Sequence, residues 1–130
     1  MDFVSIRIIT ADVDRLSAFY ARLTGREVDR VHPLFAALRG PSGVLAISSD
    51  RTVPAMTPAD LQAEANRSVI IEFRVDDVDR AFEALRGWGA EVVMEPRTMP
   101  WGNRSLLLRD PDGNLVNLYA PADPGATPAS

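Results

Sequence analysis

Two stretches of the chain alternate between apolar and polar residues, which is the pattern of a β-strand with one buried face. The stretches cover residues 3–9 and 69–75. Each is followed by apolar residues at the three- and four-residue spacing of an amphipathic helix. These helical patterns run from Val13 to Leu23 and from Val78 to Trp88. The sequence therefore predicts the same strand–helix unit twice, at an offset of 65 residues.

The ends of the two predicted helices carry matching signals. Asp12 and Asp77, each in an Asp-Val-Asp-Arg motif, stand at the N-cap position, where a carboxylate accepts hydrogen bonds from unpaired backbone N–H groups. Gly25 and Gly89 follow the two helices as stop signals. A repeat of strand, cap, helix and glycine in the same order indicates two related modules.

Shorter strands follow each predicted helix, separated by proline and glycine. We expect strands over residues 26–32, 34–40, 44–49, 90–95, 104–109 and 114–120. The last two are joined by Asp110-Pro111-Asp112-Gly113, a strong β-hairpin signal. The predicted fold class is α+β, with a single domain over residues 1–121 built from two βαβββ modules, about 1–49 and 69–121.

The segments outside the modules are polar or rich in small residues. Within the linker, residues 50–68, we expect a short helix over residues 58–65, with Thr57 as its cap and Pro58 at its first position. The tail, residues 122–130, is rich in proline, alanine and glycine, and we expect it to be disordered.

Composition narrows the functional classes. The 130 residues carry a net charge of −4 and contain no cysteine and one histidine. An acidic chain with scattered arginines does not predict nucleic-acid binding, and the lack of cysteine excludes disulfides and thiolate catalysis. No apolar run approaches the length of about 20 residues that spans a membrane, and no basic leader precedes the first strand. We therefore expect a cytoplasmic protein without a membrane or nucleic-acid partner.

Three motifs resemble those of the vicinal oxygen chelate superfamily, which includes glyoxalase I, extradiol dioxygenases, and fosfomycin and bleomycin resistance proteins. They are Ala11–Arg15 with Phe19-Tyr20, then Val75–Asp79, and finally Pro100–Arg104 with Arg109–Leu115. The resemblance implies two cupped mixed sheets around a cavity, often completed by exchange of modules across a homodimer. A homodimer is therefore expected here.

In that superfamily a divalent metal is held near the start of the first strand of each module and near the middle of the last strand. By the same count, this chain places Ser5, Ile70 and Asn117 at those positions. A hydroxyl, a hydrocarbon and an amide lack the imidazole and carboxylate donors that zinc, nickel or iron require. We expect no metal and no other cofactor, which brings the chain closest in pattern to the metal-free, bleomycin-resistance-like members.

Strand alternation predicts which side chains share the cavity face with these positions: Phe3, Arg7, Glu72, Arg74, Leu115 and Tyr119. For the charged ones there are two interpretations. Arg7, Glu72 and Arg74 form a structural ion-pair network, or one guanidinium stays free to bind an anionic or polar ligand group.

Two aromatic residues are candidates for stacking on a ligand. Trp101 lies in a proline- and glycine-flanked loop, where its ring either reaches a ligand or caps the core. Phe35 lies on a strand that lines the first module, with the same two interpretations.

The predicted function is metal-free binding of a planar, partly aromatic small molecule such as an antibiotic, in a cavity at a dimer interface. Drug resistance by sequestration is the corresponding role. The predicted ligand-binding residues are Ser5, Arg7, Phe35, Glu72, Arg74, Trp101, Asn117 and Tyr119. The alternative is a lyase, isomerase or dioxygenase of the same superfamily with an atypical or absent metal site, and no catalytic residue is assigned.

Overall fold

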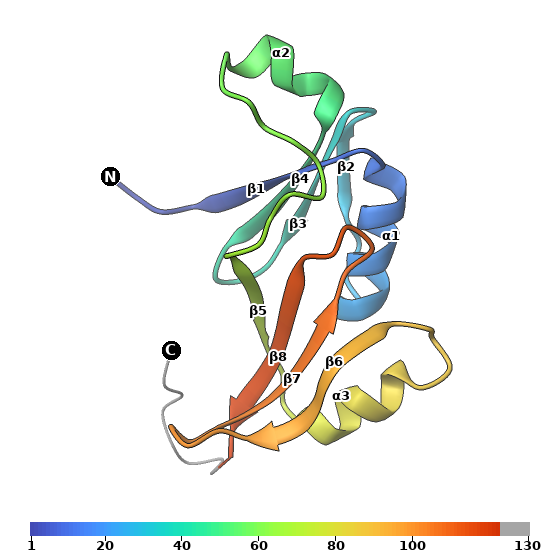
Figure 1. Ribbon diagram of the computed structural model, residues 1–130, viewed down its shortest axis with the longest axis vertical. Helices are drawn as coiled ribbons and strands as arrows, with labels where there is room; N and C mark the ends of the chain where they lie inside the picture. Colours follow the sequence, from blue (N-terminus) through green and yellow to red (C-terminus); the bar gives the residue numbers. More distant parts are fainter. Residues whose placement is uncertain (123–130) are drawn as a thin grey trace. The chain divides into compact units, whose positions relative to one another are not determined.

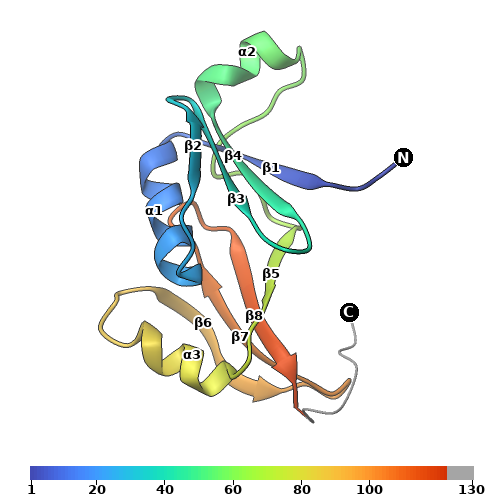
Figure 2. The same cartoon turned by 180° about the vertical axis from the view of Figure 1, so that it is seen from behind.

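The computed structural model describes residues 1–122 and divides the chain into two compact units. The first unit comprises Met1–Asn66 and the second begins at Arg67. In each unit a four-stranded mixed sheet has a helix packed against one face, as both views show (Figures 1 and 2). This confirms the predicted α+β class and the repeated βαβββ unit. Of the predicted tail, residues 123–130 lie outside the described residues.

In the first unit the sheet has the order β1-β4-β3-β2, with β1 parallel to β4 and the other pairs antiparallel. Its elements are β1 (Ser5–Thr10), α1 (Val13–Thr24), β2 (Asp29–His32), β3 (Phe35–Arg39), β4 (Val44–Ser49), a 3-10 turn (Asp50–Thr52) and α2 (Val53–Met56). Leu16 and Tyr20 of α1 are fully buried, as is Ile47 of β4. The core of this unit therefore lies between α1 and the sheet.

The second unit repeats the arrangement with the order β5-β8-β7-β6 and a parallel β5–β8 pair. Its elements are β5 (Ile70–Arg74), α3 (Val78–Leu85), β6 (Glu91–Thr98), β7 (Asn103–Arg109) and β8 (Leu115–Pro121). Val78 and Leu85 of α3 are buried, and Leu106, Leu108 and Val116 of the sheet are fully buried.

The predicted helix caps are confirmed. Asp12 accepts a hydrogen bond from the backbone N–H of Arg15, and Asp77 accepts one from Arg80, each at 3.0 Å. Gly25 ends α1 in the left-handed conformation, with φ of 68°, and its N–H donates to the carbonyl of Ala21. The same local chemistry therefore starts both helices.

The predicted end of the second helix is wrong. Helix α3 stops at Leu85 rather than at Trp88, because Arg86 turns to extended backbone (φ −63°, ψ 133°) and its N–H donates to the carbonyl of Glu83. Gly87 and Gly89 both have positive φ, so the turn that follows the helix already begins before Gly89, the predicted stop signal.

The predicted helix over residues 58–65 is also wrong. The short helix of this segment is α2, which carries its proline near its start and ends at Met56. Thr57 is extended (φ −160°, ψ 148°), and its hydroxyl accepts a hydrogen bond from the N–H of Ala59 in a local turn. Glu64, with φ of 61°, has a backbone conformation that no α-helix allows.

A bidentate ion pair joins α3 to the sheet of the second unit. The guanidinium of Arg104 on β7 donates to both carboxylate oxygens of Asp79, at 2.7 and 2.8 Å, and to the hydroxyl of Thr98 at 3.1 Å. The hydrogen bond from Arg104 is the main reason that the pKa of Asp79 lies below its usual value of 3.8.

We expect Asp79→Asn to lower the melting temperature at pH 7. The carboxylate has a lower pKa in the folded than in the unfolded chain, so it stabilises the fold above about pH 4, and this contribution is lost as the pH falls through the folded-state value. The difference from wild type should therefore shrink as the pH is lowered toward 2. Thermal melts between pH 7 and pH 2 test this, with Asp76→Asn as a charge-matched control. A difference that does not change with pH contradicts it.

Candidate functional site

The candidate site in the second unit is the sheet face opposite α3, called here the exposed face. Cross-strand register arranges its side chains in rows, since residues paired across a sheet point to the same side. The Glu72 row contains Glu72, Asn117, Leu107 and Met94. The Arg74 row contains Arg74, Tyr119, Ser105 and Arg97. The structure thus brings together four predicted residues, Glu72, Arg74, Asn117 and Tyr119.

A hydrogen bond links two of these predicted residues. The side-chain amide of Asn117 donates to Glu72 Oε2 at 2.8 Å. The other amide atom, Asn117 Oδ1, is buried and accepts no hydrogen bond from the described residues. An unsatisfied buried acceptor costs about 1–3 kcal/mol, so this position carries an energetic cost that packing alone does not explain.

The predicted residues of the first unit lie on the sheet face opposite α1. Ser5 and Arg7 are exposed on β1, and the Arg7 guanidinium approaches the sulfur of Met56 at 3.2 Å. Phe35 is 38% exposed and stacks on the ring of His32, with 5.2 Å between centroids and 11° between planes. The imidazole is fixed in turn, because His32 Nδ1 accepts a hydrogen bond from the N–H of Leu34.

An ion-pair network of Arg7 with Glu72 and Arg74 would join the two units, so that interpretation stays a prediction. Among the described residues, the Arg7 side chain contacts Met56, the Glu72 side chain accepts a hydrogen bond from Asn117, and the Arg74 side chain makes no hydrogen bond or ion pair. The alternative from the sequence, a free guanidinium on the exposed face, therefore fits the geometry of the second unit.

Trp101 lies in the turn between β6 and β7 and is 63% exposed. The turn is closed by hydrogen bonds from Gly102 N–H to the Met99 carbonyl and from Met99 N–H to the Asn103 carbonyl. A residue exposed to this extent contributes little to the core of the second unit, and its role in ligand binding stays a prediction.

Sequence reasoning missed four residues of the exposed face: Met94, Arg97, Ser105 and Leu107. Ser105 and Leu107 lie within the predicted strand 104–109, and alternation applied to that strand would have found them. Arg97 was missed because Pro96 argues against a strand, whereas β6 is an edge strand, where proline is tolerated.

The residues at the superfamily's metal positions do not fit a transition metal. Ser5 and Ile70 are exposed and offer a hydroxyl and a hydrocarbon, and the amide of Asn117 is bonded to Glu72. Within residues 1–122 no group of three or more His, Cys, Asp or Glu side chains could hold a metal ion. No chemistry is therefore assigned to a metal here.

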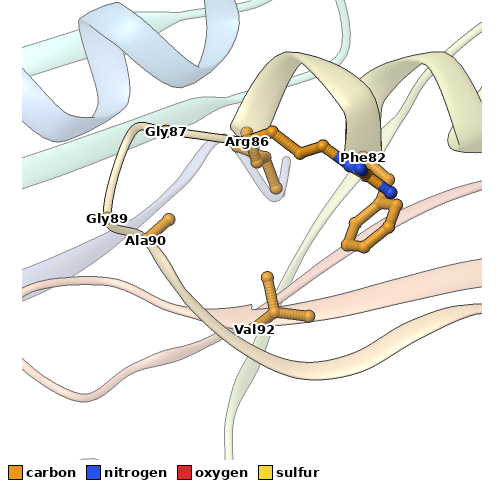
Figure 3. Close-up of a pocket in the computed structure, with 7 residues that line it drawn as sticks. Phe82, Arg86, Gly87, Gly89, Ala90 and Val92 are labelled. Carbon is orange, nitrogen blue, oxygen red and sulfur yellow. The ribbon is translucent and has the colours of Figure 1, made fainter.

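A separate hollow of about 490 Å³ lies between the end of α3 and β6 (Figure 3). It is lined by Phe82, Leu85, Arg86, Gly87, Gly89, Ala90 and Val92. The Arg86 guanidinium lies 5.7 Å from the Phe82 ring centroid and also pairs with Glu83 at 3.2 Å. None of the predicted ligand-binding residues lines this hollow, and its charged group is already paired.

Comparison with known proteins agrees with the fold and these motifs. The sequence profile of the Glyoxalase/Bleomycin resistance protein/Dioxygenase superfamily matches residues 2–118, and the chain belongs to this superfamily. The uncharacterized protein YraH of Bacillus subtilis (strain 168) is 24% identical over 125 residues, which cover 92% of this chain and 98% of YraH.

Solved structures of the same superfamily superpose well. A glyoxalase/bleomycin resistance protein/dioxygenase from Nocardioides has a TM-score of 0.79 at 24% identity, covering 100% of this chain and 89% of its own. A family enzyme from Burkholderia phytofirmans PsJN has a TM-score of 0.76 at 19% identity, covering 92% and 98%. At these identities the similarity establishes the fold and not the activity. In residues 1–122, no helix is long and apolar enough to cross a membrane.

We expect the purified protein to retain no stoichiometric zinc, nickel, manganese or iron. The reason is the neutral donor set of Ser5, Ile70 and Asn117. Elemental analysis after dialysis against a mild chelator tests this. A variant with Ser5→His, Ile70→His and Asn117→Glu, which restores the donor types of the superfamily, is the positive comparison. A metal that wild type retains at one equivalent would contradict the expectation.

Proposed function

We propose that this protein binds a planar, partly aromatic small molecule, such as an antibiotic, without using a metal. The observation that carries the proposal is the exposure of Trp101, which is 63% exposed in a hydrogen-bonded turn that joins two strands of the exposed face. Binding proteins commonly expose aromatic anchors of this kind, because burial by a ligand recovers the cost of leaving them in water.

The exposed face supplies what such a ligand needs besides the indole. Ile70, Leu107 and Leu115 provide apolar surface, with Ile70 48% exposed. Glu72, Asn117 and Tyr119 add hydrogen-bonding groups, and Arg74 adds a positive charge. A mainly apolar surface with a few placed polar groups is typical of small-molecule sites. In the first unit, Ser5, Arg7 and Phe35 are the corresponding proposed contacts.

We propose that the binding protein is a homodimer and acts in the cytoplasm, as a resistance protein that sequesters a drug would. Phe3 and Val4, which directly precede β1, are 85% and 60% exposed, and Ile70 begins the edge strand β5. Apolar side chains at open sheet edges favour association with a second chain. The two units, proposed to form one domain over residues 1–121, then pair within the chain or across the dimer.

We expect Trp101→Ala to weaken binding of flat aromatic antibiotics about tenfold to a hundredfold, equivalent to about 1.4–2.8 kcal/mol. Calorimetric titration measures the affinity. Stability should change by less than about 0.5 kcal/mol, because the ring is exposed. The control is Trp88→Phe, which leaves Trp101 as the sole tryptophan. In this variant, added antibiotic should still quench the tryptophan fluorescence. Unchanged affinity in Trp101→Ala would rule out a role of Trp101 in ligand binding. Chemical conversion of a bound compound would identify the protein as an enzyme instead.

We expect light scattering at micromolar concentration to give twice the mass of 14.2 kDa. A stable dimer buries more than about 1,000 Å² of surface in total. A charge introduced into its interface should therefore weaken the association of the two chains. Phe3→Glu, which places a charge in the exposed apolar segment before β1, should shift the equilibrium toward monomer. Asp2→Glu is the neighbouring control. A wild-type monomer at this concentration would refute the proposed assembly.

A further inference from the structure

The Arg74 row crosses all four strands of the second sheet. Arg74 on β5 pairs in register with Tyr119 on β8, Tyr119 with Ser105 on β7, and Ser105 with Arg97 on β6. The two arginines at its ends are exposed, Tyr119 is half-buried and Ser105 is 5% exposed. Two hydroxyl groups therefore lie between two guanidinium groups on one sheet face.

Neither arginine is neutralised within the described chain. The side chains of Arg74 and Arg97 make no ion pair or hydrogen bond with any residue from 1 to 122. The neighbouring acid on this face, Glu72, lies two residues from Arg74 on β5 but is hydrogen-bonded to Asn117. By contrast Arg104, on the opposite face of the same sheet, forms its bidentate pair with Asp79. The positive charge on the exposed face is thus unpaired.

The spacing of the row suits two side chains that converge on one ligand group. Neighbouring strands lie about 4.8 Å apart, so three intervals separate the ends of the row by about 14 Å. Two arginines at that separation can extend inward over Tyr119 and Ser105. A guanidinium is a planar fork of donors that matches the oxygens of carboxylate, sulfate or phosphate, and hydroxyl groups add further donors.

We propose that the Arg74 row is an oxyanion subsite, and that the ligand is a flat aromatic molecule with one acidic group at its edge. This inference rests on the proposed function, because the aromatic body is placed by that proposal. Arg97 and Ser105 become ligand contacts that the sequence did not indicate.

The surroundings of the row specify how such a ligand lies. The Glu72 row on one side contains the apolar Leu107 and Met94, which fit a ring system. On the other side the chain turns at Trp101, four residues from Arg97 and four from Ser105. An acidic group bound at the row therefore places an attached ring next to apolar surface and close to the indole turn.

A matched pair of probes tests the subsite. 2-Naphthoate and 2-naphthamide share size and ring system but differ in charge, and calorimetry gives the affinity of each. We expect the naphthoate to bind about tenfold to a hundredfold more tightly, the effect of a charge-assisted hydrogen bond. Arg74→Gln and Arg97→Gln should each remove most of this preference, because each lowers the affinity for the naphthoate far more than the affinity for the naphthamide.

The control is Arg80→Gln. Arg80 is an exposed arginine on α3 with no side-chain partner in the described chain, so this variant changes the net charge equally. Equal affinity for the two probes, or an equal loss in Arg80→Gln, would overturn the subsite. Thermal melts of all variants check that each is folded.

The outcomes separate this inference from the proposed function. If both naphthalene probes bind equally and Trp101→Ala abolishes binding, the aromatic site stands and the oxyanion subsite is wrong. If neither probe binds, sodium sulfate is titrated while the backbone amides of Arg74, Arg97 and Ser105 are followed by NMR. Saturable shifts that disappear in Arg74→Gln support an anion site without the aromatic function, and unshifted amides overturn both.

Discussion

In the part of the chain that the structure describes, one helix packs against one face of each four-stranded sheet. Helix α1 buries one face of the first sheet, and α3 buries one face of the second (Figure 1). Because successive side chains on a strand point to opposite sides, every strand has to divide its residues between a helix-covered and an uncovered face. On the covered side of the second sheet, Leu106, Leu108 and Val116 are fully buried. On the other side the same strands carry polar and charged groups beside apolar ones, and every proposed contact in this unit comes from there or from the adjoining turn.

Much of the fold is readable from the sequence because it depends on local signals. Asp12 and Asp77 cap their helices as predicted, and the predicted strands correspond to those observed, with ends that differ by a few residues. The errors have local causes too. Thr57 and Pro58 resemble a helix start but form a turn, and α3 is shorter than its apolar spacing because Arg86 leaves the helical conformation.

The candidate site was predictable only in part. Alternation placed Glu72, Arg74, Asn117 and Tyr119 on one face, and the register of β5 and β8 agrees with this. It did not supply the bond between Glu72 and Asn117, which joins residues 45 positions apart. Nor did it supply Arg97, since irregular register between β6 and β7 interrupts simple alternation along that edge strand. Contacts between distant strands depend on pairing, which a single sequence encodes weakly.

The turn at Asp110 determines more than the direction of the chain. Asp110 is 5% exposed, and its carboxylate accepts hydrogen bonds from the backbone N–H groups of Asp112 and Asn114 and from the Asn114 side chain. These three bonds fix the length of the loop between β7 and β8. A slip of one residue would turn Asn117 and Tyr119 toward the core and expose Val116 and Leu118 to water. The buried carboxylate of Asp110 thus fixes the register of β7 and β8. The polar and charged groups of the exposed face depend on this turn, although the turn itself need not contact a ligand.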